Sequence, residues 1–113
     1  MKYMLLIYHD EQAFSRLTED ARQEMYKEYR QLREELTTDS KFITGSQLQP
    51  TSMASSVRMR NGKAITTDGP YAETKEQLGG YFLIEVETAG EANAIAARIP
   101  SAEMGTVEVR ALV

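Results

Sequence analysis

Two residues at the start of the chain have side chains that can exchange protons near neutral pH. His9 is the only histidine, and it stands beside Asp10 directly after the apolar run YMLLIY. An imidazole at the end of a strand, next to a loop, is a common position for a general base. We expect His9 to be a candidate for taking a proton from a phenolic or enolic substrate. The alternative is a solvated loop histidine without a chemical role.

A second candidate carboxylate is Asp68, in the triplet Asp68-Gly69-Pro70. Glycine permits unusual φ values and proline stiffens the chain, so the triplet predicts a tight turn. The Asp68 side chain can cap this turn by accepting hydrogen bonds from backbone amides. It can also act in a cleft, as a base or as the group that orients His9. The two interpretations are compatible, and both stay open here.

The segment that follows this turn contains three candidates for ligand binding, namely Glu73, Thr74 and Lys75. The ammonium group of Lys75 can hold a carboxylate or an enolate. The alternative is a solvated charge run, whose ion pairs contribute little at a surface. Thr74 can instead cap a short helical turn that reaches Leu78.

Composition excludes several other kinds of chemistry. The chain has no cysteine and one histidine, so thiolate nucleophiles, disulfides and cysteine-based metal sites are excluded, and we expect neither a metal nor a cofactor. The net charge is −4 and the basic residues are dispersed, which disfavours nucleic-acid binding. No apolar run approaches the roughly 20 residues that span a bilayer, and Met1 leads straight into a strand pattern. We expect a cytoplasmic protein with no membrane partner.

The candidate residues must be positioned by the elements around them. The length of 113 residues predicts a single domain, residues 1–113. Alternating apolar residues predict strands at residues 2–8, 41–50, 79–87 and 105–113, and in the last strand we expect four inward residues, Val107, Val109, Ala111 and Val113. The pair Asn61-Gly62 predicts a hairpin with a type I′ turn over residues 55–66.

Two helices are predicted by caps and periodicity. The first covers residues 19–36, with Thr18 as its N-cap and apolar residues on one stripe. The second follows a capping box formed by Thr88 and Glu91 and ends at Pro100.

The order β-α-β, hairpin, β-α-β predicts an α+β fold, a ferredoxin-like split βαβ arrangement with an extra hairpin. Two helices cover one face of such a sheet, yet the strands at residues 2–8 and 79–87 are apolar on both faces. An identical subunit is the simplest cover for the second face, so we predict a homodimer with its sheets packed face to face. Close backbone packing in this dimer is the expected reason for the pair Gly79-Gly80.

The segments MKYMLLIY, TTDGPYAETKEQLGGYFLIE, AARIP and GTVEVR resemble the YCII-related family, and within it the DGPF branch named for an Asp-Gly-Pro-Phe segment. Tyr71 replaces the phenylalanine, and the region of the second helix looks shorter than is usual. The resemblance implies a ferredoxin-like fold dimerised as an α/β barrel. Within this family some members are proposed enzymes with a His-Asp pair, one related enzyme removes chloride from a chlorinated hydroquinone, and many DGPF members are encoded beside, or fused to, sigma factors.

Three functions remain open on these grounds. The first is a small-molecule enzyme that uses acid–base chemistry in a pocket between sheet and hairpin, with His9, Asp68 and Lys75 as its residues. The second is a ligand-binding or regulatory dimer without turnover. The third is a dimer that contacts other proteins, such as a sigma-factor system. Whether the protein is an enzyme is not decided by the sequence.

Overall fold

A four-stranded antiparallel sheet forms the centre of the protein in the computed structural model, which describes all residues 1–113. Its strands are β1 (Lys2–His9), β2 (Phe42–Gln47), β5 (Gln77–Glu85) and β6 (Gly105–Ala111), in the spatial order β2-β5-β1-β6. The first and third strands of the sheet therefore lie in its middle, which is the ferredoxin-like order. The predicted α+β class is confirmed.

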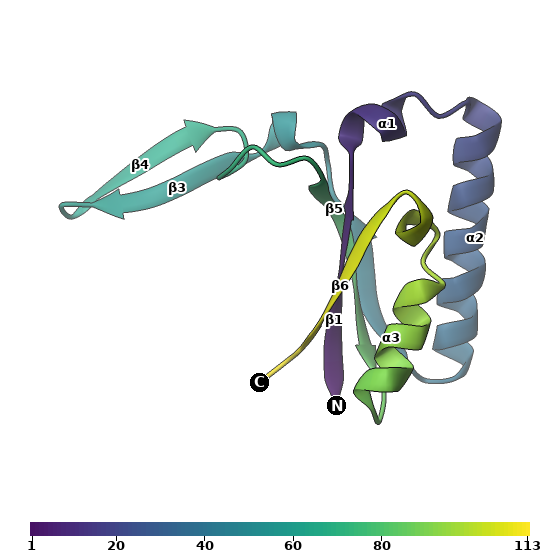
Figure 1. The fold of residues 1–113 in the computed structure, drawn as a ribbon. Coiled ribbons are helices and arrows are strands. Elements are labelled where there is room, and N and C mark those ends of the chain that lie inside the picture. Colours follow the sequence, from purple (N-terminus) through teal and green to yellow (C-terminus); the bar gives the residue numbers. More distant parts are fainter.

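Two helices, α2 (Glu19–Thr38) and α3 (Ala89–Ala97), cover one face of this sheet (Figure 1). Helix α2 begins where the Thr18 hydroxyl accepts a hydrogen bond from the amide of Ala21 at 3.1 Å, as the sequence predicts. It buries Leu32 and Leu36 against the sheet. Although α2 has 20 residues, no helix combines such a length with the apolar character needed to cross a membrane.

Helix α3 has only half of the predicted capping box. The Thr88 hydroxyl accepts a hydrogen bond from the amide of Glu91 at 3.1 Å. The Glu91 carboxylate, however, pairs with Lys41 at 2.9 Å and reaches the amide of Glu87 rather than that of Thr88. The nearby lysine thus takes the carboxylate that the box requires. The helix ends at Ala97, and Pro100 opens a short 3₁₀ turn, η2 (Pro100–Glu103).

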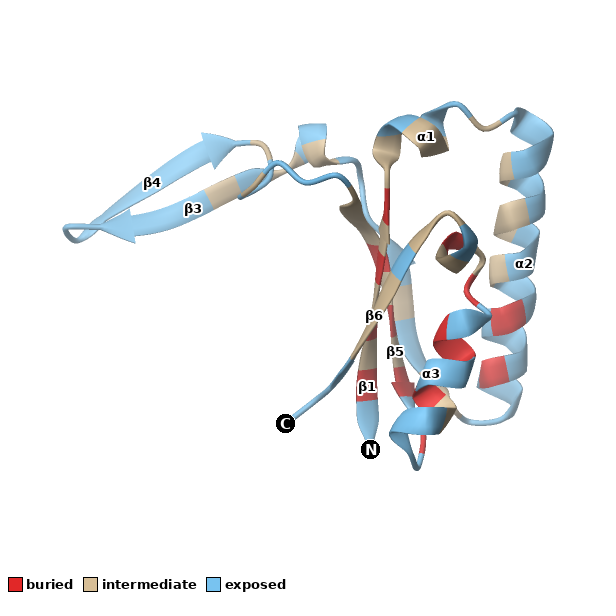
Figure 2. Cartoon of the chain, viewed as in Figure 1, coloured by how far each residue is buried: buried red, intermediate tan, exposed pale blue.

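The core lies between the sheet and the two helices, where the buried residues face one another (Figure 2). Twelve apolar residues are buried there: Tyr3, Leu5, Ile7, Leu32, Leu36, Phe82, Ile84, Val86, Ala92, Ile95, Ala96 and Ile99. Val107 and Val109 of β6 pack against this core as predicted. Ala111 and Val113 are exposed, so their predicted inward position is wrong, because the chain end passes beyond the covered part of the sheet.

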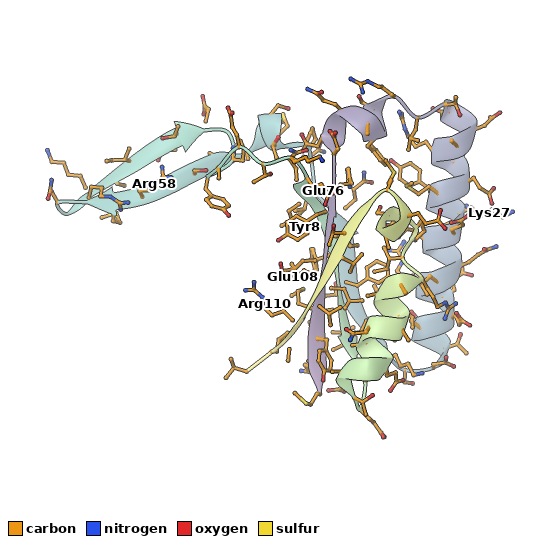
Figure 3. The ribbon with its side chains drawn as sticks, in the orientation of Figure 1. Tyr8, Lys27, Arg58, Glu76, Glu108 and Arg110 are labelled. Carbon is orange, nitrogen blue, oxygen red and sulfur yellow. The ribbon has the colours of Figure 1, made fainter.

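The opposite face of the sheet has no covering element. The side chains of Tyr8, Glu108 and Arg110 lie on this side, away from the helices (Figure 3). Along β1, residues Met4, Leu6 and Tyr8 alternate with the buried ones and are only partly buried. An apolar strip with a polar edge thus runs along the open face.

The predicted hairpin consists of β3 (Ser55–Arg60) and β4 (Lys63–Asp68), which form a separate two-stranded sheet. Asn61 and Gly62 have φ values of 51° and 74°, and a type I′ turn needs positive φ at both positions. The hairpin projects away from the helices and the main sheet (Figure 1). The radius of gyration is 15.9 Å, against about 13 Å for a compact domain of this length.

One helix was not predicted. Helix α1 (Glu11–Ser15) follows β1 directly and is capped by Asp10, whose side chain accepts hydrogen bonds from the amides of Gln12 and Ala13. Five residues are too few for an apolar period, so the cap was its only signal in the sequence. A second 3₁₀ turn, η1 (Thr51–Met53), links β2 to the hairpin.

Candidate functional site

A pocket of about 460 Å³ opens between the sheet and helix α2, within the range usual for small-molecule sites. Its buried part is formed by the sheet and by η2, through Ile7, His9, Phe82 and Ser101. Helix α2 supplies the opposite wall with five residues: Met25, Tyr26, Tyr29, Arg30 and Arg33. This pocket lies under α2 rather than between sheet and hairpin, and a site between sheet and hairpin stays a prediction.

His9 ends β1 inside this pocket and is only 8% exposed. The alternative of a solvated loop histidine is thereby excluded. Its ring stands 4.8 Å from the ring of Phe14 on α1, centroid to centroid. Neither ring nitrogen has a hydrogen-bond partner in the chain, but only Nδ1 is fully sequestered. Nε2 is therefore the atom that a bound molecule can reach.

The protonation of His9 is set mainly by burial. Burial lowers the pKa of His9 below its usual value of 6.5, while the negative charges of Glu11, Asp10 and Glu76 act in the opposite direction. The imidazole is therefore neutral at pH 7, with one nitrogen as a donor and the other as an acceptor. In this state Nε2 can exchange a hydrogen bond, or a proton, with a molecule in the pocket.

A pair of hydroxyl groups adds polar atoms next to the buried part of the pocket. The Tyr29 hydroxyl and Ser101 Oγ lie 2.7 Å apart and share a hydrogen bond between α2 and η2. Burial raises the pKa of Tyr29 above its usual 10.0, and the hydrogen bonds with Ser101 offset part of this rise. Both hydroxyls therefore keep their protons at neutral pH and can orient a polar group of a ligand.

The glycine pair at residues 79 and 80 has an explanation within the chain. A Cβ on Gly79 would lie 2.9 Å from His9 Nδ1 and closer still to Cε1. A Cβ on Gly80 would lie 2.9 Å from the carbonyl oxygen of Ser46 in β2. The expected cause, packing in a dimer, is therefore not needed: Gly79 makes room for the histidine ring and Gly80 for the neighbouring strand.

Helix α1 is held in place by a carboxylate that the sequence did not single out. The two oxygens of Glu11 accept hydrogen bonds from the amide and the hydroxyl of Thr51, each at 2.8 Å. The amide of Glu11 donates to the side chain of Gln77 at 2.9 Å. These bonds tie α1 to η1 and to the start of β5. They thereby fix the segment that carries Phe14 and closes one side of the pocket.

Asp68 is not brought together with His9. It is the last residue of β4, exposed at the base of the hairpin, and it does not line the pocket. Its carboxylate accepts no hydrogen bond in the chain, so the predicted capping of its own turn is wrong. The turn is held instead by the amide of Gly69 on the carbonyl of Ala54 at 2.7 Å, and by the Ser56 hydroxyl on the Gly69 carbonyl at 2.9 Å. The φ of 102° at Gly69 explains why glycine is needed there.

The other predicted ligand-binding residues lie on the exposed segment between β4 and β5. Glu73 and Lys75 form no ion pair, and neither lines the pocket. The Thr74 hydroxyl donates to the carbonyl of Glu76 at 2.6 Å in an irregular turn, so the helical turn reaching Leu78 is absent. A binding role for these three residues stays a prediction.

Sequence reasoning missed the two arginines of the pocket, Arg30 and Arg33. On an amphipathic helix such residues look like part of the solvated face. Their spacing of three residues was the available signal, because it places both on the same side of the helix.

No three acidic or histidine side chains are gathered in the arrangement that a metal ion needs.

Comparison with known proteins gives two matches over nearly the whole chain. The family described as the YCII-related domain matches residues 1–113. An uncharacterised protein of Rhizobium meliloti (strain 1021) is 32% identical over 114 aligned residues, which cover 99% of this chain and 92% of that relative. The match to the family spans every element described above, including the projecting hairpin. The chain belongs to the YCII-related family.

Proposed function

We propose that the protein binds a small phenolic or enolic molecule in the pocket under α2 and exchanges a proton with it through His9. The observation that carries this proposal is a buried, neutral histidine that lines a pocket of about 460 Å³ and has no hydrogen-bond partner in the chain. A polar group that is buried without a partner costs about 1–3 kcal/mol, so a chain rarely keeps one without use. The Tyr29 and Ser101 hydroxyls line the same pocket and can hold the oxygen of the substrate.

Deuterium exchange of a carbon acid tests the proton transfer, and the variant His9→Gln shows whether His9 is the base. In D₂O, carbon acids such as aromatic 2-oxo acids exchange their α-protons for deuterium when a base forms the enol. We expect the protein to accelerate this exchange and His9→Gln to abolish the acceleration. Asp68→Asn tests whether Asp68 assists His9, as its sequence suggests, although Asp68 lies outside the pocket. Full activity of this variant would exclude a catalytic role for Asp68.

Binding without turnover is the alternative, and the same samples decide it. Nitrogen-resolved NMR of the one imidazole shows whether a phenol or enol reaches Nε2. If the His9 signals shift on titration but no exchange follows, the protein is a binding module. If His9 signals do not respond to any phenol or enol at millimolar concentration, the proposal is wrong.

The assembly that we propose for this function is a homodimer through the open face of the sheet. Three observations support it: the partly buried apolar strip of β1, the uncovered face, and a hairpin that stands apart with exposed Val57, Met59 and Ile65. An isolated two-stranded hairpin is marginally stable in water, so a partner surface would stabilise it. Sedimentation equilibrium at micromolar concentration tests the assembly. A monomer there would refute it, and Leu6→Lys should convert a dimer to monomer.

A further inference from the structure

The charged side chains that line the pocket differ in sign from the net charge of the protein, although the carboxylates of Glu11, Asp10 and Glu76 lie close enough outside the lining to act on His9. The chain has 17 acidic and 13 basic residues and a net charge of −4. Among the 14 residues that line the pocket there are two arginines, a neutral histidine and no carboxylate. A site lined by one sign of charge raises the local concentration of ions of the other sign.

The two arginines are free to bind a ligand. The ion pairs of the structure join other residues, namely Lys41 to Glu91, Arg98 to Glu35 and Arg110 to Glu108. The guanidinium groups of Arg30 and Arg33 have neither an ion pair nor a hydrogen bond in the chain. Each presents five N–H donors in a planar fork that fits a carboxylate with two parallel hydrogen bonds.

The positions of Arg30 and Arg33 indicate how a ligand would be oriented in the pocket. Arg30 and Arg33 are exposed and form the mouth, whereas His9, Phe82 and Ser101 are buried and form the floor. An acid group of a ligand therefore stays at the mouth near water. The opposite end of the ligand reaches the polar groups of the floor, which are the histidine and the Tyr29–Ser101 pair.

Aromatic rings line the space between mouth and floor. Phe14 packs on His9, and the rings of Tyr29 and Phe82 meet edge to face with centroids 6.1 Å apart. Tyr26 adds a further ring to the wall of α2. Flat walls of this kind favour a planar body, because aromatic pairs stack or meet edge to face with gains beyond simple burial.

We infer that the ligand is a planar aromatic or conjugated carboxylate that carries a hydroxyl or enol at its far end. Arg30 and Arg33 bind its carboxylate at the mouth, and His9 meets its hydroxyl at the floor. This inference rests on the proposed function and narrows it from any phenol or enol to an anionic one. It makes the two arginines binding residues for the same molecule that exchanges its proton with His9.

The test compares two probes of nearly the same shape, 4-hydroxybenzoate and 4-hydroxybenzamide, in which a neutral amide replaces the charged carboxylate and leaves one acceptor oxygen instead of two. Each is titrated into the full chain, with the His9 imidazole signals and calorimetry as readouts. Replacing one arginine removes charge-assisted hydrogen bonds worth about 1.5–3 kcal/mol, which corresponds to a loss of affinity of about 10- to 150-fold. We expect this loss for 4-hydroxybenzoate in Arg30→Gln and in Arg33→Gln, and little change for 4-hydroxybenzamide.

Lys27→Gln is the matched control. It removes one positive charge from the same helix, and the Lys27 side chain points away from the sheet (Figure 3). We expect it to keep the affinity for both probes within about twofold, because a solvated charge outside the pocket is screened by salt.

The outcomes separate the two proposals. If both probes bind with equal affinity and both shift the His9 signals, the pocket function stands and the inference of an anionic ligand is overturned. If Lys27→Gln weakens 4-hydroxybenzoate as much as Arg30→Gln does, general attraction rather than the two arginines explains the binding, and the inference is again overturned. If neither probe binds at millimolar concentration, both proposals are overturned.

Discussion

The contact between Gly79 and the His9 ring gives the sharpest prediction about the site. In Gly79→Ala the new methyl group would lie 2.9 Å from Nδ1 and nearer to Cε1, so the ring or β5 must move. The ring cannot simply turn away, because it is buried and packs on Phe14. Overpacking of this kind costs about 1–3 kcal/mol. In a domain of this size we expect Tm to fall by about 4–15 °C.

The assay is a double-mutant cycle with His9→Ala, measured by urea unfolding under circular dichroism. Removing the ring opens the space that the methyl group needs. In the His9→Ala background we therefore expect Gly79→Ala to be neutral, or to stabilise by about 0.5–1 kcal/mol, because alanine fits a strand interior better than glycine. The imidazole NMR signals of Gly79→Ala should also differ from those of the wild type.

Gly80→Ala is the control for this cycle. Its methyl group would meet the carbonyl oxygen of Ser46, a backbone atom that His9→Ala does not remove. Its cost should be the same in both backgrounds. If the costs of Gly79→Ala and His9→Ala simply add, within about 0.5 kcal/mol, then the ring does not set the glycine at residue 79 and our account of the pocket floor is refuted.

Three further predictions concern His9, Glu11 and Thr88. Burial holds the pKa of His9 below 6.5, so neutral His9 contributes fully to the free energy of unfolding above pH 6.5. This contribution is lost as the pH falls towards the lowered pKa, with a slope of up to about 1.4 kcal/mol per pH unit. Between pH 7.5 and 5.5, the free energy of unfolding in urea should therefore change less in His9→Gln than in the wild type. Glu11→Ala leaves the Thr51 amide without its acceptor and should cost about 1–3 kcal/mol, with faster hydrogen exchange at that amide; unchanged exchange would show that these bonds do not hold α1. Thr88→Ala removes the cap of α3 and should cost about 0.5–2 kcal/mol in urea unfolding, whereas Thr37→Ala, in the last turn of α2, should have little effect.

Much of the fold could be predicted because its signals are local. The side chains of a strand alternate with a period of two residues, and the pair Asn61-Gly62 is compatible with few turn types. Thr18 and Thr88 both cap helices, as their sequences indicate. The helix and the capping box that were not predicted correctly also have physical reasons. Helix α1 is too short to show a period, and Lys41, which is distant in sequence, draws the Glu91 carboxylate out of its box.

Of the candidate residues that the sequence predicts, only His9 lines the pocket, where a rare residue type ends a strand. The pocket around it is formed by contacts between distant parts of the chain, such as Tyr29 with Ser101, and no local pattern carries such contacts. Arg30 and Arg33 look like surface charges until the sheet is placed opposite them. Conversely, the sequence of the turn at Asp68 suggests a chemical role, whereas the backbone geometry of that turn is explained by Gly69 and the hydrogen bonds across the hairpin base.

The projecting hairpin offers a protease assay for the proposed dimer. Arg58, Arg60 and Lys63 lie at or near its tip, all exposed, on strands that no other element covers. In a free subunit, trypsin should cut there well before it cuts the main sheet, because exposed loop tips are preferred sites of cleavage. A partner subunit that holds the hairpin would protect the same bonds. The ratio of cut to intact chain, followed across protein concentration, would then measure how tightly the two copies associate.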